Sequence, residues 1–359
     1  MRSGIARPGI ARPVLVLGAA LTTALTLSSC SLIDSGGDSS GGSGEDTVVL
    51  VTHDSFSLPD EVVAEFEEDS GYDLQVRQVG DGGTLTNELV LTADDDPLGD
   101  VAFGVDNTYA SRALDAGVFA PYEFDAPPGV AEHALPGDDE HALTAVDTGS
   151  VCVNVDVAWF DEHGIEPPRT LDDLTDPKYR DLFVTPGATT STPGMAFLLT
   201  TVAAYGDDWP DYWADLMANG AKLTKGWEDA YNVDFSFSGG DRPIVLSYDS
   251  SPAFTVKGGR TTTRALLDTC FEQVEYAGLI DGADNPEGGK ELIRFLVSDR
   301  VQAALPESMY VFPVVEGVEL PKDWARFAER PTEPYVVDPA DVGEHREDWL
   351  REWSDVTSR

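Results

Sequence analysis

The pattern of hydrophobic and polar positions alternates between two periods in the first third of the chain. Three short runs rich in β-branched and apolar residues have the pattern of strands: residues 48–53, 73–79 and 100–105. Each is followed by a stretch with apolar side chains on one helical face, which predicts amphipathic helices: residues 59–69, 84–92 and 108–116. We expect the first helix to stop at Gly71, and the second to be capped by Thr84 or by the Gly82-Gly83 turn. This alternation predicts a parallel sheet with helices on its faces.

The rest of the chain continues the α/β pattern with longer elements. Two long apolar runs, residues 147–157 and 271–280, predict strands that cross to a second domain and return. Shorter strands are expected at residues 182–186 and 243–248. Four helices are predicted: residues 193–205, 208–219, 285–304 with a break at Pro306, and 342–356. At 359 residues the chain is long enough for two domains, each with its own core.

The first thirty residues carry an export pattern. Three arginines precede an apolar run at residues 14–27, which is too short to span a membrane stably. The run ends in Leu-Ser-Ser-Cys, which is similar to a bacterial lipobox in which Cys30 is lipidated and becomes the mature N-terminus. We therefore expect residues 1–29 to be a lipoprotein signal peptide and residues 30–46 to be a Gly/Ser-rich tether. The protein is then extracytoplasmic and anchored to the cell membrane by lipid.

The net charge limits the classes of partner, and the cysteine content raises the question of a disulfide. The 23 basic and 65 acidic residues argue against nucleic acid and anionic lipid, favour a soluble monomer, and would draw cationic solutes toward the protein. Beyond Cys30 the exported body holds Cys152 and Cys270, in a compartment that permits disulfides. A bridge between them and two separate thiols are equally compatible with the sequence, because a disulfide needs a geometry that the sequence does not reveal.

No catalytic, cofactor or metal site is predicted. The five histidines are scattered without the spacing of metal ligands. A Gly-x-Ser-x-Gly pattern occurs at residues 37–41, inside the expected tether, where no strand-to-helix turn can form. His53, Asp54 and Ser55 are adjacent on a strand, so their side chains point to opposite faces and cannot form a catalytic relay. An enzyme is therefore not expected.

Aromatic and small polar residues gather around the predicted strand at 243–248. Trp227 and Tyr231 share a face if a helix begins at Gly226, and Tyr248 ends the strand. In α/β proteins a ligand binds at the carboxyl ends of such strands. Packing in the core is the alternative for each aromatic residue.

Polar residues also follow the first three strands. They are His53, Asp81 and Asp106, and at this edge of a parallel sheet they would line one crevice. Ser191 precedes the helix at 193–205, whose free backbone N–H groups could hold an anionic or hydroxyl-bearing ligand. Helix capping is the alternative for Asp106 and for Ser191.

Seven motifs in order carry a family resemblance. They are T-x-D-S-F at 52–56, Asp-Gly at 81–82, D-V-x-x-G-x-D-N at 100–107, T-S-T-P-G at 190–194, T-K-G-W-x-x-A-Y at 224–231, V-L-S-Y-x-x-S-P-A at 245–253, and P-x-x-x-aromatic-x-x-P at 306–313. With them, the chain from residue 48 to its end resembles the extracellular solute-binding proteins of bacterial ABC importers, and within these the thiamine-binding members.

The resemblance implies a fold and a pocket. The fold would be the type II periplasmic-binding-protein fold, with two lobes, each a mostly parallel sheet flanked by helices, and the ligand in the cleft between them. Lobe 1 would be residues 47–150 and 275–359, and lobe 2 residues 151–274. The implied ligand-binding residues are His53, Asp81, Asp106, Ser191, Trp227, Tyr231, Tyr248, Phe254 and Tyr310. Where the family has Tyr, Trp and Tyr, this chain has His53, Tyr310 and Phe254.

The resemblance further implies capture of thiamine, its phosphates or a related cationic heterocycle, and delivery to ABC permease and ATPase subunits. Aromatic faces stabilise a cation such as the thiazolium by about 0.5–2 kcal/mol each, and a desolvated Asp81 carboxylate would add to this. A ferric-iron or polyamine binder of the same fold is the alternative. Iron capture in this class uses neighbouring tyrosines, whereas Tyr248 is followed by Asp249. A polyamine would require more carboxylates than Asp81 and Asp106.

Overall fold

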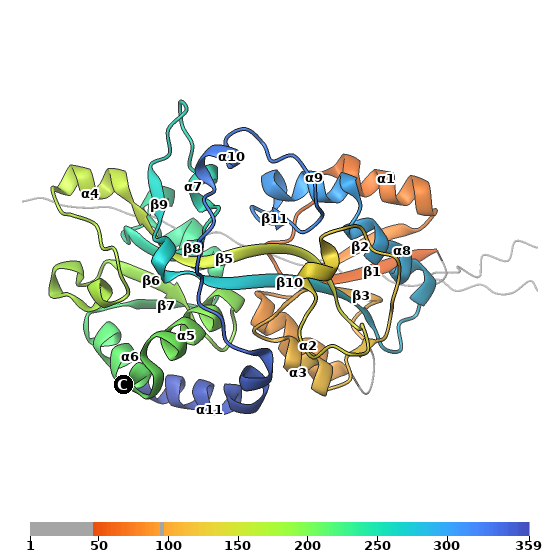
Figure 1. Ribbon diagram of the computed structural model, residues 1–359, viewed down its shortest axis with the longest axis horizontal. Helices are drawn as coiled ribbons and strands as arrows, with labels where there is room; N and C mark the ends of the chain where they lie inside the picture. The colour runs from red at the N-terminus through yellow and green to blue at the C-terminus, as the bar shows by residue number, and fades with distance from the viewer. Residues whose placement is uncertain (1–45, 94–96, 359) are drawn as a thin grey trace, which may run out of the picture. The chain divides into compact units, whose positions relative to one another are not determined.

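The computed structural model describes residues 46–93 and 97–358 (Figure 1). The predicted signal peptide, the predicted lipidation site Cys30 and the expected tether up to residue 45 lie outside the described residues. All the elements below belong to the unit Gly42–Arg359. None of the helices within these described ranges combines the length and the apolar character needed to cross a bilayer.

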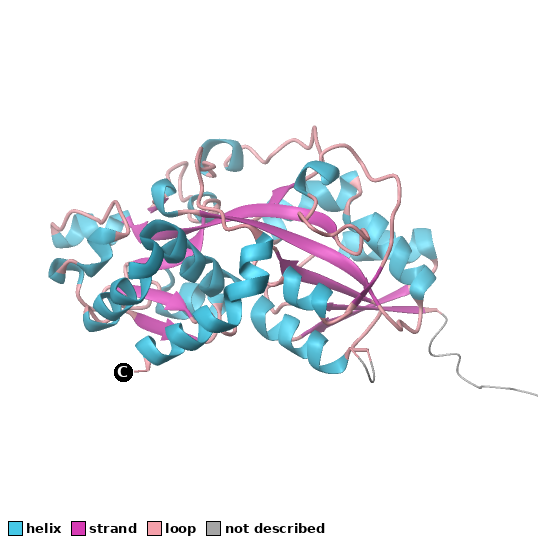
Figure 2. Ribbon diagram, turned by 60° about the horizontal axis from the view of Figure 1, so that its bottom comes forward, coloured by secondary structure: helices cyan, strands magenta, loops and turns pink. Residues whose placement is uncertain are grey.

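A mixed sheet runs through this unit, with helices on both of its faces (Figure 2). Its main strands lie in this order: β2 (Asp73–Gln78), β1 (Thr47–Thr52), β3 (Val101–Asp106), β10 (Phe271–Ile280), β5 (Thr144–Asp156), β8 (Ile244–Tyr248), β6 (Phe183–Pro186) and β7 (Lys222–Thr224). Three short strands pair with the two middle ones: β4 (Phe119–Ala120) with β10, and β9 (Thr263–Ala265) and β11 (Phe312–Pro313) with β5.

The sheet consists of two parallel groups joined by an antiparallel pair. Strands β2, β1 and β3 are parallel to one another and form the first strand group. Strands β8, β6 and β7 are likewise parallel and form the second strand group. Between them β5 and β10, the central strand pair, are antiparallel to each other and to the groups that they border. The structure thus confirms long strands where the sequence predicted them at 147–157 and 271–280, and all thirteen residues of β5 are buried.

Helices cover the two strand groups separately. The first group carries α1 (Asp60–Ser70), α2 (Gly82–Thr92), α3 (Ala110–Asp115) and α8 (Pro286–Leu296), whereas α9 (Asp299–Ser308) contacts α8, β5 and β11. The second carries α4 (Val157–His163), α5 (Thr192–Tyr205), α6 (Trp209–Ala218), a π-helical turn (Asp229–Asp234), and α7 (Ser251–Phe254), which contacts α10 (Trp324–Phe327). The C-terminal α11 (Pro339–Thr357) contacts α3 and α6, so it touches helices of both groups.

Local signals set most of the helix boundaries. Gly71 ends α1 in the left-handed conformation with φ 77°, as predicted, and its N–H donates to the Glu67 carbonyl. The expected cap of α2 is wrong: the side chain of Asp81 caps this helix by accepting from the Gly82 N–H, so the helix begins two residues before Thr84.

The single helix expected at 285–304 is also wrong. It is divided into α8 and α9 because Ser298 takes an extended conformation and its hydroxyl accepts from the Val301 N–H. Pro306 lies inside α9, which continues to Ser308.

The structure joins Cys152 on β5 to Cys270, the residue before β10, in a disulfide. The question that the sequence left open is thereby answered. The bridge links residues 118 positions apart and joins the two strands of the central strand pair, with the second strand group in the chain segment between the two cysteines.

Candidate functional site

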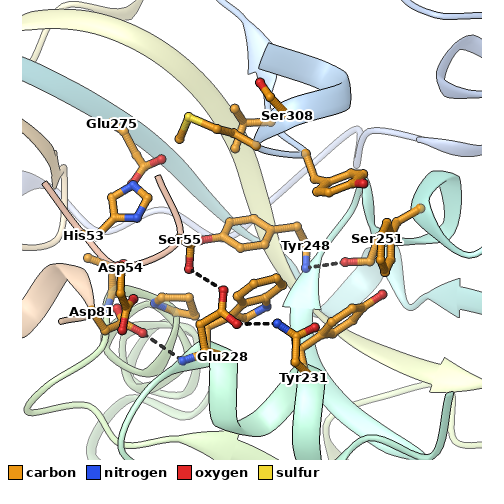
Figure 3. Close-up of a pocket in the computed structure, with 18 residues that line it drawn as sticks. His53, Asp54, Ser55, Asp81, Glu228, Tyr231, Tyr248, Ser251, Glu275 and Ser308 are labelled. Carbon is orange, nitrogen blue, oxygen red and sulfur yellow. Dashed lines mark hydrogen bonds and ion pairs between the residues drawn. The ribbon is translucent and has the colours of Figure 1, made fainter. Parts of the chain in front are cut away.

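A cavity of about 210 Å³ lies among loops from both strand groups and the end of α9 (Figure 3). The loop after β1, the residue before α2 and strand β10 form one part of the wall, and the segments around α5, the π-helical turn and α7 form another. Eighteen residues line it: His53, Asp54, Ser55, Asp81, Thr192, Pro193, Trp227, Glu228, Tyr231, Asn232, Tyr248, Ser251, Phe254, Glu275, Ser308, Met309, Tyr310 and Val311.

Seven of the nine predicted binding residues line this cavity, and two do not. The two are Asp106 and Ser191, both fully buried. Asp106 accepts hydrogen bonds from the N–H and the hydroxyl of Thr108 at 3.1 and 2.7 Å. Ser191 caps α5 by accepting from the Gly194 N–H at 3.4 Å. The capping alternative therefore describes Ser191 and the Oδ1 of Asp106, whereas the Oδ2 of Asp106 is buried without a hydrogen-bond partner.

Asp81 is held by three backbone N–H groups from three segments. Its Oδ1 accepts from Gly82 at 2.7 Å and from Thr192 at 3.1 Å, and its Oδ2 accepts from Trp227 at 2.8 Å. Burial nevertheless raises its pKa to about 6. Asp81 follows the first strand group, whereas Thr192 and Trp227 belong to the second. One carboxylate thus connects both sides of the cavity floor.

Aromatic rings form a continuous wall. Trp227 and Tyr231 stack with ring centroids 5.1 Å apart and planes 14° apart, and the indole N–H of Trp227 donates to the Ser247 hydroxyl. The π-helical turn keeps these two rings on one face, as the sequence predicted. Phe254 lies 6.2 Å from Tyr231 and 4.6 Å from Tyr310, and 42% of its surface is exposed. An exposed ring in contact with the buried ring of Tyr231 and the half-buried ring of Tyr310 is suited to receive a flat ligand.

Tyr310 takes the left-handed conformation, with φ 58°. This costs a bulky L-residue roughly 1–2 kcal/mol, so the surrounding structure must hold it in place. The hydroxyl of Ser250 does so by donating to the Tyr310 carbonyl at 2.6 Å. Backbone strain at a cavity wall is a feature of functional sites.

The cavity is acidic. Among the described residues that line it, four are carboxylic acids (Asp54, Asp81, Glu228, Glu275) and none is a Lys or Arg. Burial, and then the neighbouring carboxylates of Glu228 and Asp229, raise the pKa of Asp54. A cationic ligand would relieve this repulsion.

Sequence reasoning missed the two glutamates. Glu228 accepts from the Ser55 hydroxyl at 3.2 Å and from the Asn232 amide, which ties the loop after β1 to the π-helical turn. Its place directly after Trp227 was the available signal. Glu275 is a carboxylic acid in a largely apolar strand, and this mismatch was the only sign of its role.

His53 lies beside Glu275 at the cavity wall. Its Nε2 is 3.5 Å from the Glu275 Oε1 and has no hydrogen-bond partner. Burial lowers the pKa of His53 to about 4, so the ring is neutral at physiological pH. Gly104 makes room for it, because a Cβ at this position, where φ is 98°, would lie 2.2 Å from the His53 Cδ2.

Stacked rings, neutral hydrogen-bonding groups and unneutralised carboxyl groups suit a flat, positively charged organic ligand. Within residues 46–93 and 97–358, no group of three or more His, Cys, Asp or Glu side chains is placed to hold a metal ion.

Comparisons with known proteins give a consistent result. Residues 96–329 match the family described as bacterial extracellular solute-binding protein. The thiamine-binding periplasmic protein of Escherichia coli (strain K12) is 30% identical over 325 residues, which cover 87% of this chain and 94% of the relative.

Solved structures match as well. A structure described as a periplasmic thiamin binding protein has a TM-score of 0.78 and 28% identity, covering 89% of this chain and 98% of the other. Iron-bound HitA from Pseudomonas aeruginosa has a TM-score of 0.68 at 19% identity, covering 86% of this chain and 99% of the other, and shows a shared fold.

Proposed function

Because this chain belongs to the bacterial extracellular solute-binding proteins, a solute-binding and not an enzyme family, we propose that it captures thiamine and delivers it to an ABC importer. Relatives described as thiamine-binding periplasmic proteins align with most of the chain, which supports an extracytoplasmic substrate-binding role. Thiamine carries a permanent thiazolium cation and a flat aminopyrimidine.

The single observation that carries the proposal is the composition of the cavity wall. Stacked Trp227 and Tyr231 offer an aromatic face to a flat ring. Four carboxyl groups without a Lys or Arg among the described lining residues favour a positive charge. Each aromatic face in contact with the cation would contribute about 0.5–2 kcal/mol.

The polyamine alternative gains one supporting observation. The sequence offered Asp81 and Asp106 alone, whereas the cavity wall adds Asp54, Glu228 and Glu275. The aromatic stack still favours thiamine, because a polyamine is flexible and has no ring to stack. Ferric iron is disfavoured, because Tyr248 is followed by the buried Asp249 and the described residues contain no metal-ligating carboxylate or histidine cluster.

Titration calorimetry of the mature protein against thiamine, spermidine and ferric citrate tests the three ligands. We expect saturable binding of thiamine at a ratio of one to one. A variant with Trp227→Ala should bind thiamine at least tenfold more weakly, whereas Trp159→Phe, at a ring on α4 that contacts Phe160 and His163 and does not line the cavity, should bind it normally. Tight binding of spermidine or ferric iron without thiamine binding would contradict the proposal.

Two lobes and a lipid anchor complete the proposed mechanism. Lobe 1 comprises residues 47–150 and 275–359, lobe 2 comprises residues 151–274, and the cavity closes as the lobes approach. Cys30 would carry the lipid that keeps the monomer beside its permease and ATPase partners. A Cys30→Ala variant should leave the membrane fraction, and mass spectrometry of the native protein should find acyl chains on its N-terminal peptide.

A further inference from the structure

Three acidic residues stand in one row across three adjacent strands. Glu275 on β10 is directly opposite Asp106 on β3, and directly opposite Asp147 on β5. Residues that are directly opposite in neighbouring strands direct their side chains to the same face of the sheet. The row Asp106–Glu275–Asp147 therefore presents three carboxyl groups side by side, and Glu275, its middle member, lines the cavity.

The carboxyl row is buried and lacks counter-charges. Asp106, Asp147 and Glu275 are 0%, 1% and 6% exposed. Neither carboxyl oxygen of Asp147 has a hydrogen-bond partner, and the Oδ2 of Asp106 has none either. Three ionised carboxylates in this position would repel one another at low dielectric and leave buried acceptors unpaired, which is strongly unfavourable.

Protons are the counter-charges that remain. Among the described residues no metal-ligating cluster exists, so a bound metal ion does not explain the row. Burial raises the pKa of Asp147 to about 8, and burial with the charges of Asp147 and Asp106 raises the pKa of Glu275 well above its ordinary value. A protonated Glu275 can donate a hydrogen bond to Asp147, which otherwise receives none.

We propose that Glu275 is a cation-recognising residue of the cavity that is protonated when the cavity is empty and ionised when a cationic ligand is bound. This rests on the proposed function in taking thiamine as the cation. On binding, the O–H bond of the Glu275 carboxyl breaks, its proton passes to solvent, and the electron pair stays on the carboxylate facing the ligand. Capture of one cation thereby releases up to one proton, and the net charge of the buried site is conserved.

None of the other groups that face Glu275 could supply the positive charge that the ligand brings. From the loop after β1 it faces neutral His53, from the residue before α2 it faces Asp81, and from β8 it faces Tyr248. All three are neutral or negative at physiological pH, so none supplies the positive charge that would ionise Glu275. A cation in the cavity does supply it.

Proton release is measured by titrating thiamine into the mature protein near neutral pH, in buffers with different ionisation enthalpies. For the native protein the slope of observed enthalpy against buffer ionisation enthalpy should correspond to about one released proton, and log Ka should rise by up to about one per pH unit. Glu275→Gln should bind more weakly, release close to no proton and lose this pH dependence. Glu228→Gln, at a carboxylate outside the row, should also bind more weakly but keep the proton release.

Two outcomes would overturn the inference: no proton release by the native protein, which includes transfer of the proton to His53, or an undiminished release by Glu275→Gln. Infrared difference spectra between native protein and Glu275→Gln provide a readout without ligand. At neutral pH the native protein should show a protonated-carboxyl C=O band that the variant lacks, and its absence would contradict the proposal. Failure of thiamine to bind while this band is present would instead contradict the proposed function.

Discussion

The carboxylate of Asp81 accepts the backbone N–H of Trp227 at 2.8 Å, although the two residues are 146 positions apart. The same carboxylate accepts from Thr192 and from its own neighbour Gly82. A residue that follows the first strand group therefore positions both the principal aromatic wall and the start of α5. This contact connects the stability of the fold to the shape of the cavity.

Replacing Asp81 by Asn should lower both the stability of the fold and the affinity for thiamine. An amide has one accepting oxygen instead of two and presents an N–H₂ to backbone donors, so at least one of the three N–H groups loses its partner. We expect the free energy of unfolding to fall by about 1.5–3 kcal/mol and thiamine affinity to fall as well, measured by urea denaturation and calorimetry. Asp139→Asn, at an exposed loop position, is the matched control and should change neither.

Replacing Gly83 by Ala should push α2 away from the segment that precedes α5, on the opposite side of the cavity. A Cβ there would lie 2.6 Å from the Tyr109 hydroxyl and 2.7 Å from the backbone of Thr190, which precedes α5. Gly83→Ala should lower the free energy of unfolding by about 1–3 kcal/mol despite the better helix propensity of alanine, and should weaken thiamine binding. Gly343→Ala, in α11 with no atom closer than 3.5 Å, should not destabilise the protein. Equal behaviour of the two variants would contradict this account.

The carboxyl row should make the protein more stable in mild acid than at slightly alkaline pH. Asp147 has a folded pKa of about 8, far above its unfolded value. Between these values the folded state binds more protons than the unfolded state, so the free energy of unfolding falls as the pH rises through this window. Thermal unfolding should give a higher Tm near pH 5 than near pH 8.

Asp147→Asn tests whether the row causes this trend. The variant removes an ionisable group without changing the shape of the side chain. Its Tm should exceed that of the native protein near pH 8 and should vary less with pH. A native Tm that rises from pH 5 to pH 8 would refute the expected sign.

Loss of the Cys152–Cys270 disulfide should lower stability substantially. The bridge restricts a segment of 118 residues in the unfolded chain, and removal of native disulfides costs about 2–5 kcal/mol. The double variant Cys152→Ala, Cys270→Ala should show this loss in urea denaturation. Addition of reductant during unfolding should reduce the stability of the native protein toward that of the variant, and should leave the variant unaffected.

The sequence predicted elements whose signals are local. The strand–helix alternation, the end of α1 at Gly71 and the two long strands β5 and β10 all follow from periodicity and from turn residues. Ser298 shows the limit of this reasoning: a serine inside an amphipathic run was compatible with one helix, and only its extended backbone divides the run into α8 and α9.

The sequence predicted the site residues that lie in recognisable motifs. It did not predict those whose neighbours depend on the register between strands. Trp227, Tyr248 and Tyr310 lie in motifs of the resemblance and line the cavity. Glu275 was missed because its importance depends on which residues of β3 and β5 face it, and strand register is a long-range property. Asp106 ends a strand, which predicts a place at the cavity, but the Thr108 hydroxyl and N–H two residues later bind its Oδ1.

The C-terminal helix α11 gives the two strand groups a third connection, in addition to β5 and β10. Its contacts with α3 and α6 lie well away from the central strand pair (Figure 1), with Trp353 packed edge-on against Trp213 and Arg346 placed over the ring of Tyr109. If β5 and β10 were the only connections, the two strand groups could twist relative to each other as freely as they bend. A brace anchored at both ends and distant from that axis opposes the twist, so in the proposed closure the aromatic rings and carboxyl groups of opposing walls would meet in one alignment.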